Sequence, residues 1–440
     1  MMIRQMMHCQ WPANTGKQNI NHIRSGLKLT FAGLLTALLL IAKTSFAAGP
    51  GEAADPFDFD LTESAEPTET NWQVNGYLEW RSRYALPQRD WLSNRMLTQL
   101  ETRYESDEWL FFSSAQMEYD PATTDYRSAE RFNLNEAYFS FDGDQFDLMI
   151  GKQRIAWGVA DGRSTIDRVN AVDMREPIGN GRTSARRPSW AVFTEYNQDW
   201  GIWEAVWLPR GRDRKFAEFG SPWEMPFINQ LRRQERDGQI ALEIDDPHPH
   251  EGGIRFTHYG QGLDWGLAYF NGYTDAPIVL ENKDNRIWLR PERIQTWNIN
   301  LASGIGKNTL RAEFSHTPDF PTINGQTESL TQVVTGWDRT FLTDLYVNIQ
   351  IYWDGYDETE DDYGLTFAIT NGFYRDALEL GIRGQTARDA QYVLEVFANY
   401  QVNDNLSLDI KSLTFGGDTD TGIGAFRDND FVELAIRYAF

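Results

Sequence analysis

Apolar and polar side chains alternate along most of the chain after residue 71. Successive side chains of a β-strand point to opposite faces, so each alternating segment would have one apolar and one polar face. One clear example alternates apolar and polar groups: Leu345, Val347, Ile349, Ile351 and Trp353 surround Asn348 and Gln350. Segments of this kind begin near residues 72, 94, 109, 130, 144, 189, 200, 251, 262, 291, 307, 329, 342, 362, 375, 390, 404 and 430. The pattern predicts an all-β fold of about 18 strands, within a range of sixteen to twenty.

The links between these segments alternate in length. Short links lie near residues 106–107, 143, 197–198, 260–261, 304–306, 340, 372–373 and 403. Longer links lie near residues 121–129, 158–188, 210–249, 273–289, 317–328, 354–361 and 414–428, and modest ones near 86–91 and 386–389. Outer-membrane barrels have short periplasmic turns and longer external loops, whereas a soluble sandwich would show no such alternation. The links therefore predict a transmembrane, antiparallel, up-and-down β-barrel, with a short helix near residues 231–236 in its longest link.

The last ten residues separate into two faces of one strand. Val432, Leu434, Ile436, Tyr438 and the terminal Phe440 share the apolar face. Glu433 and Arg437 lie on the opposite face, which a lipid-spanning strand tolerates only if that face borders a polar lumen. A soluble edge strand is the alternative interpretation of the tail alone. The tail resembles the closing strand recognised by the bacterial outer-membrane barrel assembly machinery, which implies that machinery as a partner.

The N-terminal residues have the pattern of an export signal. Basic residues, an apolar run and small residues follow one another: Arg4, Lys17, Arg24 and Lys28, then Leu29–Ala42, then Ser45, Phe46 and Ala47. The run of about 14 residues is shorter than the roughly 20 that a membrane-spanning helix needs. We therefore predict a signal peptide at 1–47, a flexible periplasmic leader at 48–71 and the barrel at 72–440. The only cysteine, Cys9, lies in the predicted signal.

Composition narrows the choice of function. The chain has a formal charge of −23, and loss of the predicted signal, with five basic and no acidic residues, changes it to −28. Nucleic acid is therefore excluded as an expected partner. The mean hydropathy of −0.53 argues against a bundle of membrane helices. The 14% aromatic content, with 16 Trp, is typical of a barrel with aromatic girdles at both membrane interfaces.

Charged residues of both signs are expected to face the lumen, because they alternate with the apolar positions. They are Arg81, Arg83, Glu101, Arg103, Glu118, Arg255, Arg311, Glu313, Glu379, Arg383, Glu395, Asp409, Lys411, Glu433 and Arg437. Two interpretations stay open. The residues could form a polar conduit with a transverse field, or they could form a ladder of compensating ion pairs that stiffens the wall.

The segment 151–190 carries the clearest chemical signal. Its basic residues are Lys152, Arg154, Arg163, Arg168, Arg175, Arg182, Arg186 and Arg187, and its acidic residues are Asp161, Asp167, Asp173 and Glu176. The local charge of +4 contrasts with the strongly negative chain. Guanidinium groups suit carboxylate or phosphate ligands, and the segment falls in the third long external link, which in porins often folds into the barrel. These basic residues, with Asp161, Asp167 and Asp173, are the candidate selectivity groups; compensating ion pairs are the equally open alternative.

Within this segment, Gly151-Lys152-Gln153, Trp157-Gly158 and Arg163 resemble a pattern of alginate-export-like barrels and related porin-like outer-membrane proteins. The resemblance implies an eighteen-stranded barrel that acts as a passive export or diffusion channel with an arginine-lined lumen. The resemblance is specific over about 40 residues. Over the rest of the chain it is a likeness of architecture alone.

The same segment contains a conflict of alternation. Lys152 shares a face with Ile150, and a lysine that faces lipid at mid-membrane costs about 2–4 kcal/mol. We therefore expect a β-bulge at Gly151. Such a bulge would turn Lys152 and the arginine two residues later inward and would send Ile155 and Trp157 to the outer girdle.

These observations predict a porin-like channel of the bacterial outer membrane for passive passage of polar, anionic solutes or polysaccharide. It would contact outer-membrane lipid and lipopolysaccharide, and it needs no cofactor or metal. A non-conducting barrel that serves a secretion, lipid-export or polymer-export system is the alternative. An outer-membrane hydrolase is disfavoured, because none of the histidines after the predicted signal lies in a nucleophile motif: His248, His250, His258 and His316.

Overall fold

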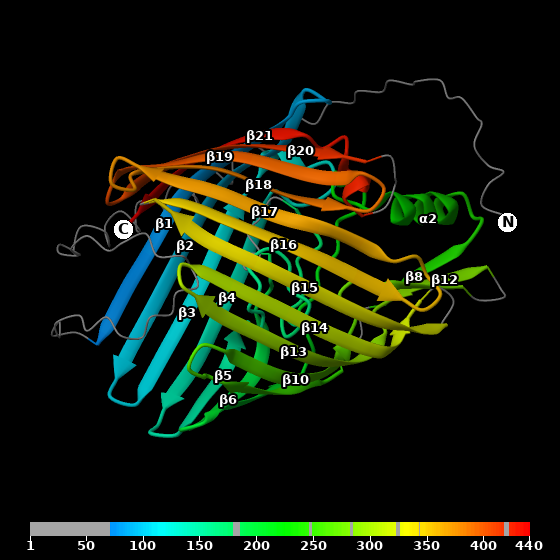
Figure 1. Cartoon of the computed structure of the whole chain (residues 1–440). Helices are drawn as coiled ribbons and strands as arrows, with labels where there is room; N and C mark the ends of the chain where they lie inside the picture. The colour runs from blue at the N-terminus through cyan, green and yellow to red at the C-terminus, as the bar shows by residue number, and fades with distance from the viewer. Residues whose placement is uncertain are drawn as a thin grey trace. The chain divides into compact units, whose positions relative to one another are not determined.

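The computed structural model describes residues 71–440, apart from 179–184, 246–248, 282–284, 323–325, 343 and 418–421. The predicted signal peptide and almost all of the predicted leader lie outside the described residues and remain predictions. The described chain forms one 18-stranded antiparallel sheet, and pairing of the first barrel strand with the last closes it (Figure 1). The fold class predicted from the sequence is confirmed.

The barrel strands follow one another in chain order. They are β1 (Trp72–Ala85), β2 (Asp90–Ser106), β3 (Trp109–Tyr119), β4 (Glu130–Asp142), β5 (Phe146–Gln153), β6 (Ser189–Gln198), β7 (Gly201–Leu208), β9 (Glu251–His258), β10 (Asp264–Tyr273), β13 (Arg293–Ile305), β14 (Asn308–Pro321), β15 (Thr327–Phe341), β16 (Leu345–Tyr356), β17 (Asp362–Phe373), β18 (Leu378–Ala387), β19 (Gln391–Asn403), β20 (Leu406–Gly416) and β21 (Phe431–Ala439). Each predicted segment begins within four residues of one of these strands.

The predicted alternation of short and long links is present, with one difference of extent. The link predicted at 317–328 is shorter, because β14 and β15 continue to pair beyond a register shift after Thr317, as far as Pro321 and Thr327. The strands β14 and β15 are therefore longer at this end than the alternation of side chains predicted.

The wall is one residue thick, and its two faces differ in polarity. In β13 the side chains of Trp297 and Ile299 are 57% and 42% exposed, whereas Asn298 and Asn300 between them are only 3% exposed. Apolar groups on the outer surface and polar groups inside reverse the arrangement of a soluble protein. The outer face fits lipid, and the inner face borders a polar interior, as the alternation predicted.

Opposite charges compensate one another along the inner wall. Examples are the pairs Arg437–Glu79 at 2.7 Å, Arg383–Glu395 at 2.6 Å and Arg255–Glu204 at 3.3 Å. These contacts support the ion-pair ladder for the wall positions.

The remaining elements lie in the long links. They are the helix α2 (Pro226–Arg236), the short 3-10 helices η2 (Pro121–Thr123) and η4 (Gly422–Phe426), and a small sheet of β8 (Ala241–Ile244), β11 (Ile278–Glu281) and β12 (Arg286–Arg290). The helix α2 confirms the predicted helix in the longest link. Among the residues that the structure describes, no helix has the length and apolar character needed to cross a membrane.

The predicted bulge at Gly151 is wrong. Pairing of β5 with β4 and with β6 runs through Gly151 without a shift, and the irregularity lies one strand earlier, where Asn135 is the extra residue of β4 opposite β3.

The expected inward turn of Lys152 and Arg154 is nevertheless present. Lys152, next to last in β5, has a side chain that is 13% exposed and lies 4.0 Å from Asp213 of the link between β7 and β9, and Arg154 donates to the carbonyl of Arg186. The ammonium group of Lys152 donates to the carbonyl of Leu134 at 2.6 Å.

The expected placement of Ile155 and Trp157 in the outer girdle is also wrong. Their side chains are 7% and 1% exposed and pack inside, against a cluster that includes Leu208 and Phe270. Gly253 of β9 makes room for the indole, because a Cβ at that position would lie 2.8 Å from Cη2 of Trp157. The chain leaves β5 inward, whereas the bulge hypothesis had assumed that the strand continued.

Candidate functional site

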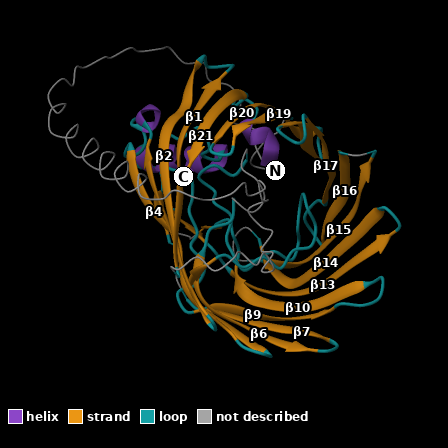
Figure 2. Cartoon of the chain, turned by 90° about the vertical axis from the view of Figure 1, so that its left-hand side faces the viewer, coloured by secondary structure: helices purple, strands orange, loops and turns teal. Residues whose placement is uncertain are grey.

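Two long links fold into the barrel, where Figure 2 shows loop segments within the ring of strands. The first, which we call the inner loop, is residues 154–188 between β5 and β6. Its contacts lie on β14, β15 and β16, although β7, β9, β10 and β13 separate β6 from β14 in the sheet. The inner loop therefore leaves its own side of the wall and crosses the interior.

The tip of the inner loop is held by one carboxylate. Glu313 of β14, only 1% exposed, accepts hydrogen bonds from the backbone N–H groups of Val159 and Ala160, both at 2.8 Å. It also accepts from the hydroxyl of Ser164 at 2.8 Å and from the N–H of Thr165 at 2.7 Å. The hydroxyl of Thr165 also donates to it at 3.4 Å. Five donors of the loop thus converge on a single side chain, so the position of the tip is strongly specified.

Strand β16 completes this anchor. The N–H groups of Gly162 and Arg163 donate to the side-chain oxygen of Gln350 at 3.0 and 2.9 Å. The guanidinium group of Arg163 pairs with Asp354 and lies 4.1 Å from the centre of the Tyr352 ring. Arg163, one of the predicted selectivity residues, therefore has a structural contact at the wall.

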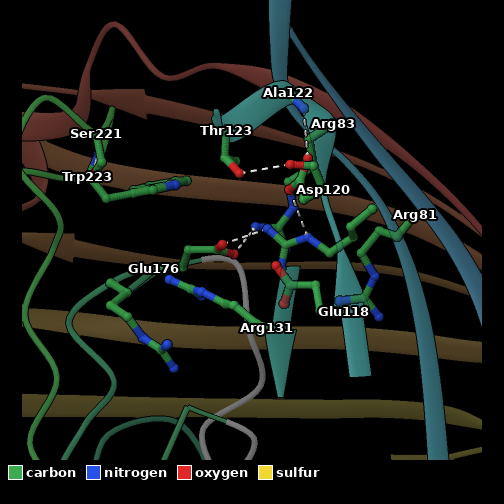
Figure 3. A network of polar contacts seen from close by, with 12 residues as sticks. Arg81, Arg83, Glu118, Asp120, Ala122, Thr123, Arg131, Glu176, Ser221 and Trp223 are labelled. Atoms are coloured by element: carbon green, nitrogen blue, oxygen red, sulfur yellow. Dashed lines mark hydrogen bonds and ion pairs between the residues drawn. The ribbon is translucent and has the colours of Figure 1, made fainter. Parts of the chain in front are cut away.

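A second anchor joins the inner loop to another part of the wall. Glu176 accepts a hydrogen bond from Arg83 of β1 at 2.7 Å and from Arg95 of β2 at 2.5 Å. Figure 3 shows Glu176 in this network of polar contacts, in which Arg83 is labelled. Burial alone would raise the pKa of Glu176, but Arg95 and Arg83 outweigh burial and hold that pKa well below its usual range.

The second inward link is residues 209–225, the first part of the connection between β7 and β9, and it is attached by aromatic packing. Trp223, 5% exposed, contacts Phe415 of β20, Phe426 of η4 and Phe431 of β21, with ring centres 5.5–6.5 Å apart. The two links also contact each other, since Arg187 pairs with Asp213 at 2.6 Å. Together they form one connected body inside the barrel.

Most of the predicted selectivity residues lie in this body, and most are paired with neighbours. Arg175 and Arg187 pair with Asp173, Arg186 lies 3.4 Å from Asp167, Asp161 pairs with Arg311, Lys152 lies 4.0 Å from Asp213, and Arg154 donates to the carbonyl of Arg186. Arg182 lies outside the described residues. The segment therefore carries less available positive charge than its composition indicated.

Arg168 is different. Its guanidinium group donates to the side-chain oxygen of Gln332 in β15 and to the carbonyl of Thr165 at 3.1 Å. Among the described residues, no carboxylate lies within 4.0 Å of it. Burial lowers the pKa of Arg168 to about 10, against the opposing effect of Asp275. Arg168 remains a cation at neutral pH and is the member of the predicted set best able to receive an anion.

Sequence reasoning placed Arg83 and Glu313 on the lumen face but did not show that they hold the inner loop, and it missed an acidic row. Asp142, Asp147, Glu195 and Glu204 are successive cross-strand partners on β4, β5, β6 and β7. Arg255 of β9 is the next partner in the row and pairs with Glu204 at 3.3 Å. These residues are distant in sequence, so only the strand register could have revealed their proximity. The interior thus carries separate acidic and basic areas.

Comparisons with known proteins agree with the barrel. No protein-family model and no curated protein matches the chain. Solved structures do: OccAB4 of Acinetobacter baumannii is 10% identical, with a TM-score of 0.53 over 85% of this chain and 99% of that one. OprD of Pseudomonas aeruginosa is 11% identical, with a TM-score of 0.51 over 84% and 95%. OccK2 of Pseudomonas aeruginosa, solved with glucuronate, is 9% identical, with a TM-score of 0.52 over 84% and 97%.

The chain therefore has the fold of bacterial outer-membrane porins, and its apolar outer surface fits the outer membrane. At these identities the likeness concerns the fold alone. The resemblance to alginate-export-like barrels remains a prediction.

Proposed function

We propose that the chain is a porin-like channel through which polar, anionic solutes or polysaccharide cross the outer membrane by diffusion. The observation that carries this proposal is the inner loop, which crosses a polar interior and brings Arg168 there without a carboxylate partner within 4.0 Å among the described residues. A fixed loop inside a barrel narrows the conduit, and a guanidinium group at the narrowing favours anions. No catalytic step is part of the proposal.

Two further facts support an anionic solute. A guanidinium group binds a carboxylate through paired, charge-assisted hydrogen bonds. One structural neighbour, OccK2, was solved in complex with glucuronate, a carboxylated sugar. The acidic row on β4 to β7 supplies the opposite sign on another part of the wall, so a passing solute would experience a transverse field.

The test is the reversal potential of single channels in planar bilayers under a salt gradient. We expect the wild-type channel to favour anions and Arg168→Gln to shift the reversal potential toward cation preference. The matched control is Arg286→Gln, because Arg286 lies in the small external sheet and its side chain is 55% exposed. Equal shifts in both variants, or none in Arg168→Gln, would argue against the role of Arg168.

A non-conducting barrel that serves a secretion or polymer-export system is the second candidate. The two links that cross the interior and contact each other favour it, because they occupy part of the lumen. Folded protein that inserts into bilayers without discrete openings would support this candidate and contradict the channel.

A further inference from the structure

Glu176 lies between two guanidinium groups of the inner wall that are arranged like a carboxylate-binding site. Each of its carboxylate oxygens receives a different guanidinium group: Oε2 contacts Arg83 at 2.7 Å and Oε1 contacts Arg95 at 2.5 Å. Two arginines from adjacent strands thus hold one carboxylate between them, as they would hold the carboxylate of a bound solute.

The two guanidinium groups also have partners in the wall, so Glu176 is not the only residue that positions them. The side chains of Arg83 and Arg95 are only 1% and 10% exposed, whereas Glu176 is 17% exposed. Arg83 also pairs with Glu433 of β21, and Arg95 lies 3.6 Å from Asp120. The guanidinium groups are therefore positioned by the wall, and the carboxylate of Glu176 reaches them from the interior side.

Charge within this network also points to an anion. Within the described residues, ion pairs connect six cations to four carboxylates other than Glu176. The cations are Arg81, Arg83, Arg95, Arg127, Lys411 and Arg437, and the carboxylates are Glu79, Glu118, Asp120 and Glu433. Counted over these ion pairs alone, four of the cations share two carboxylates around Arg83, and Arg95 and Arg127 share the other two. Glu176 joins the two clusters and lies beside the one with a formal surplus of positive charge.

We infer that Arg83 and Arg95 form a subsite for the carboxylate of an anionic solute, and that Glu176 is a tethered competitor that fills this subsite in the absence of solute. The inference rests on the proposed function, because the solute has to enter the lumen. A solute that displaces Glu176 would release the second anchor of the inner loop, while Glu313 keeps the tip in place. Solute binding would thereby be coupled to the position of the loop.

The test is isothermal titration of the full chain, folded in detergent micelles, with gluconate as a small monocarboxylate probe. Glu176→Ala removes the competitor, and we expect it to bind gluconate at least about tenfold more tightly than wild type, which corresponds to about 1.4 kcal/mol. Glu176→Gln, which keeps the shape but not the charge, should fall between them. The double variant Glu176→Ala with Arg95→Gln should lose the gain.

The matched control is Glu218→Gln. Glu218 lies on the other inward link and pairs with Arg131 of β4, so the same chemical change is made next to a different strand arginine. Its affinity for gluconate should equal that of wild type. No gain in Glu176→Ala, or an equal gain in Glu218→Gln, would overturn the inference.

The titration separates this inference from the proposed function. A gain in Glu176→Ala with a barrel that stays silent in bilayers supports the subsite and contradicts the channel. Anion-selective openings without a gain support the channel and refute the subsite.

Discussion

The inner loop is attached to the wall at two places by different chemistry. At the tip, Glu313 accepts five hydrogen bonds, three from backbone amides and two from hydroxyl groups of the loop. At the second anchor, Glu176 is held by the charged side chains of Arg83 and Arg95. The tip anchor requires the backbone to fold in one way, whereas the second anchor requires only a carboxylate. The tip anchor is therefore suited to fix the loop. At the second anchor, the carboxylate of a solute could replace that of Glu176.

The largest expected effect comes from removing the tip anchor. Glu313→Ala leaves buried donors of Val159, Ala160 and Thr165 without their acceptor, at about 1–3 kcal/mol for each buried donor. The tip should then detach, and single-channel conductance should rise while the barrel remains folded by circular dichroism. Ser303→Ala is a control on the neighbouring strand, since among the described residues the side-chain hydroxyl of Ser303 donates only to the carbonyl of Gly262. Unchanged conductance in Glu313→Ala would mean that the tip does not narrow the conduit.

A smaller, local effect is expected from Arg95→Gln. This change removes one of the two arginines that hold Glu176, so hydrogen exchange should increase around residues 174–178 and stay unchanged at 159–165. Equal increases at both places would show that the two anchors are not independent.

The second anchor should withstand mild acid. The pKa of Glu176 is lower in the folded protein than its ordinary value of 4.5, so its contribution is complete above that value and is lost as pH falls through the lowered folded pKa. The protection factors of the amides at residues 174–178, which correct for the pH dependence of free amide exchange, should therefore stay constant from pH 7 to about pH 5. A loss of protection within this window would show that the ion pairs do not hold the loop.

The smallest effect is expected for Lys152→Gln at the rim. The ammonium group lies at the end of β5 and donates to Leu134, so its loss should change the free energy of unfolding by less than about 1 kcal/mol in urea. A lysine that faced lipid at mid-membrane would give a stabilisation of about 2–4 kcal/mol when neutralised. A stabilisation of that size would indicate that Lys152 faces lipid, contrary to the structure.

The wall of the barrel could be predicted almost completely, and the interior only in part. Alternation is a local property, so the two faces of β13 and the end of β21 are evident from neighbouring residues. Contacts across the lumen are not local: Val159 and Glu313 are 154 residues apart, and nothing in either segment names the other. The arginine-rich segment was evident, but its pairing with Asp173, Asp213 and Asp354 depended on how two links fold together.

The failed prediction at Gly151 has the same cause. The alternation of Ile150 and Lys152 was correct, but Lys152 turns inward at the end of β5 without a bulge, toward Asp213 of another link. Sequence periodicity does not show where a strand ends and its side chains leave the alternating pattern. The small change of direction after Gln153 also decided the placement of Trp157, which packs against Gly253 inside the barrel.

The most direct measurement of the central claim, that the inner loop lies in the conduction path, is thiol labelling of Asp161→Cys during single-channel recording. Asp161 is on the tip and its side chain is 43% exposed, and the only native cysteine, Cys9, lies in the predicted signal. Leu342→Cys, on a short turn and 94% exposed, is the matched control. A bulky thiol reagent should reduce the current stepwise in Asp161→Cys and leave it unchanged in Leu342→Cys. Complete labelling of Asp161→Cys without a change of current would contradict the claim.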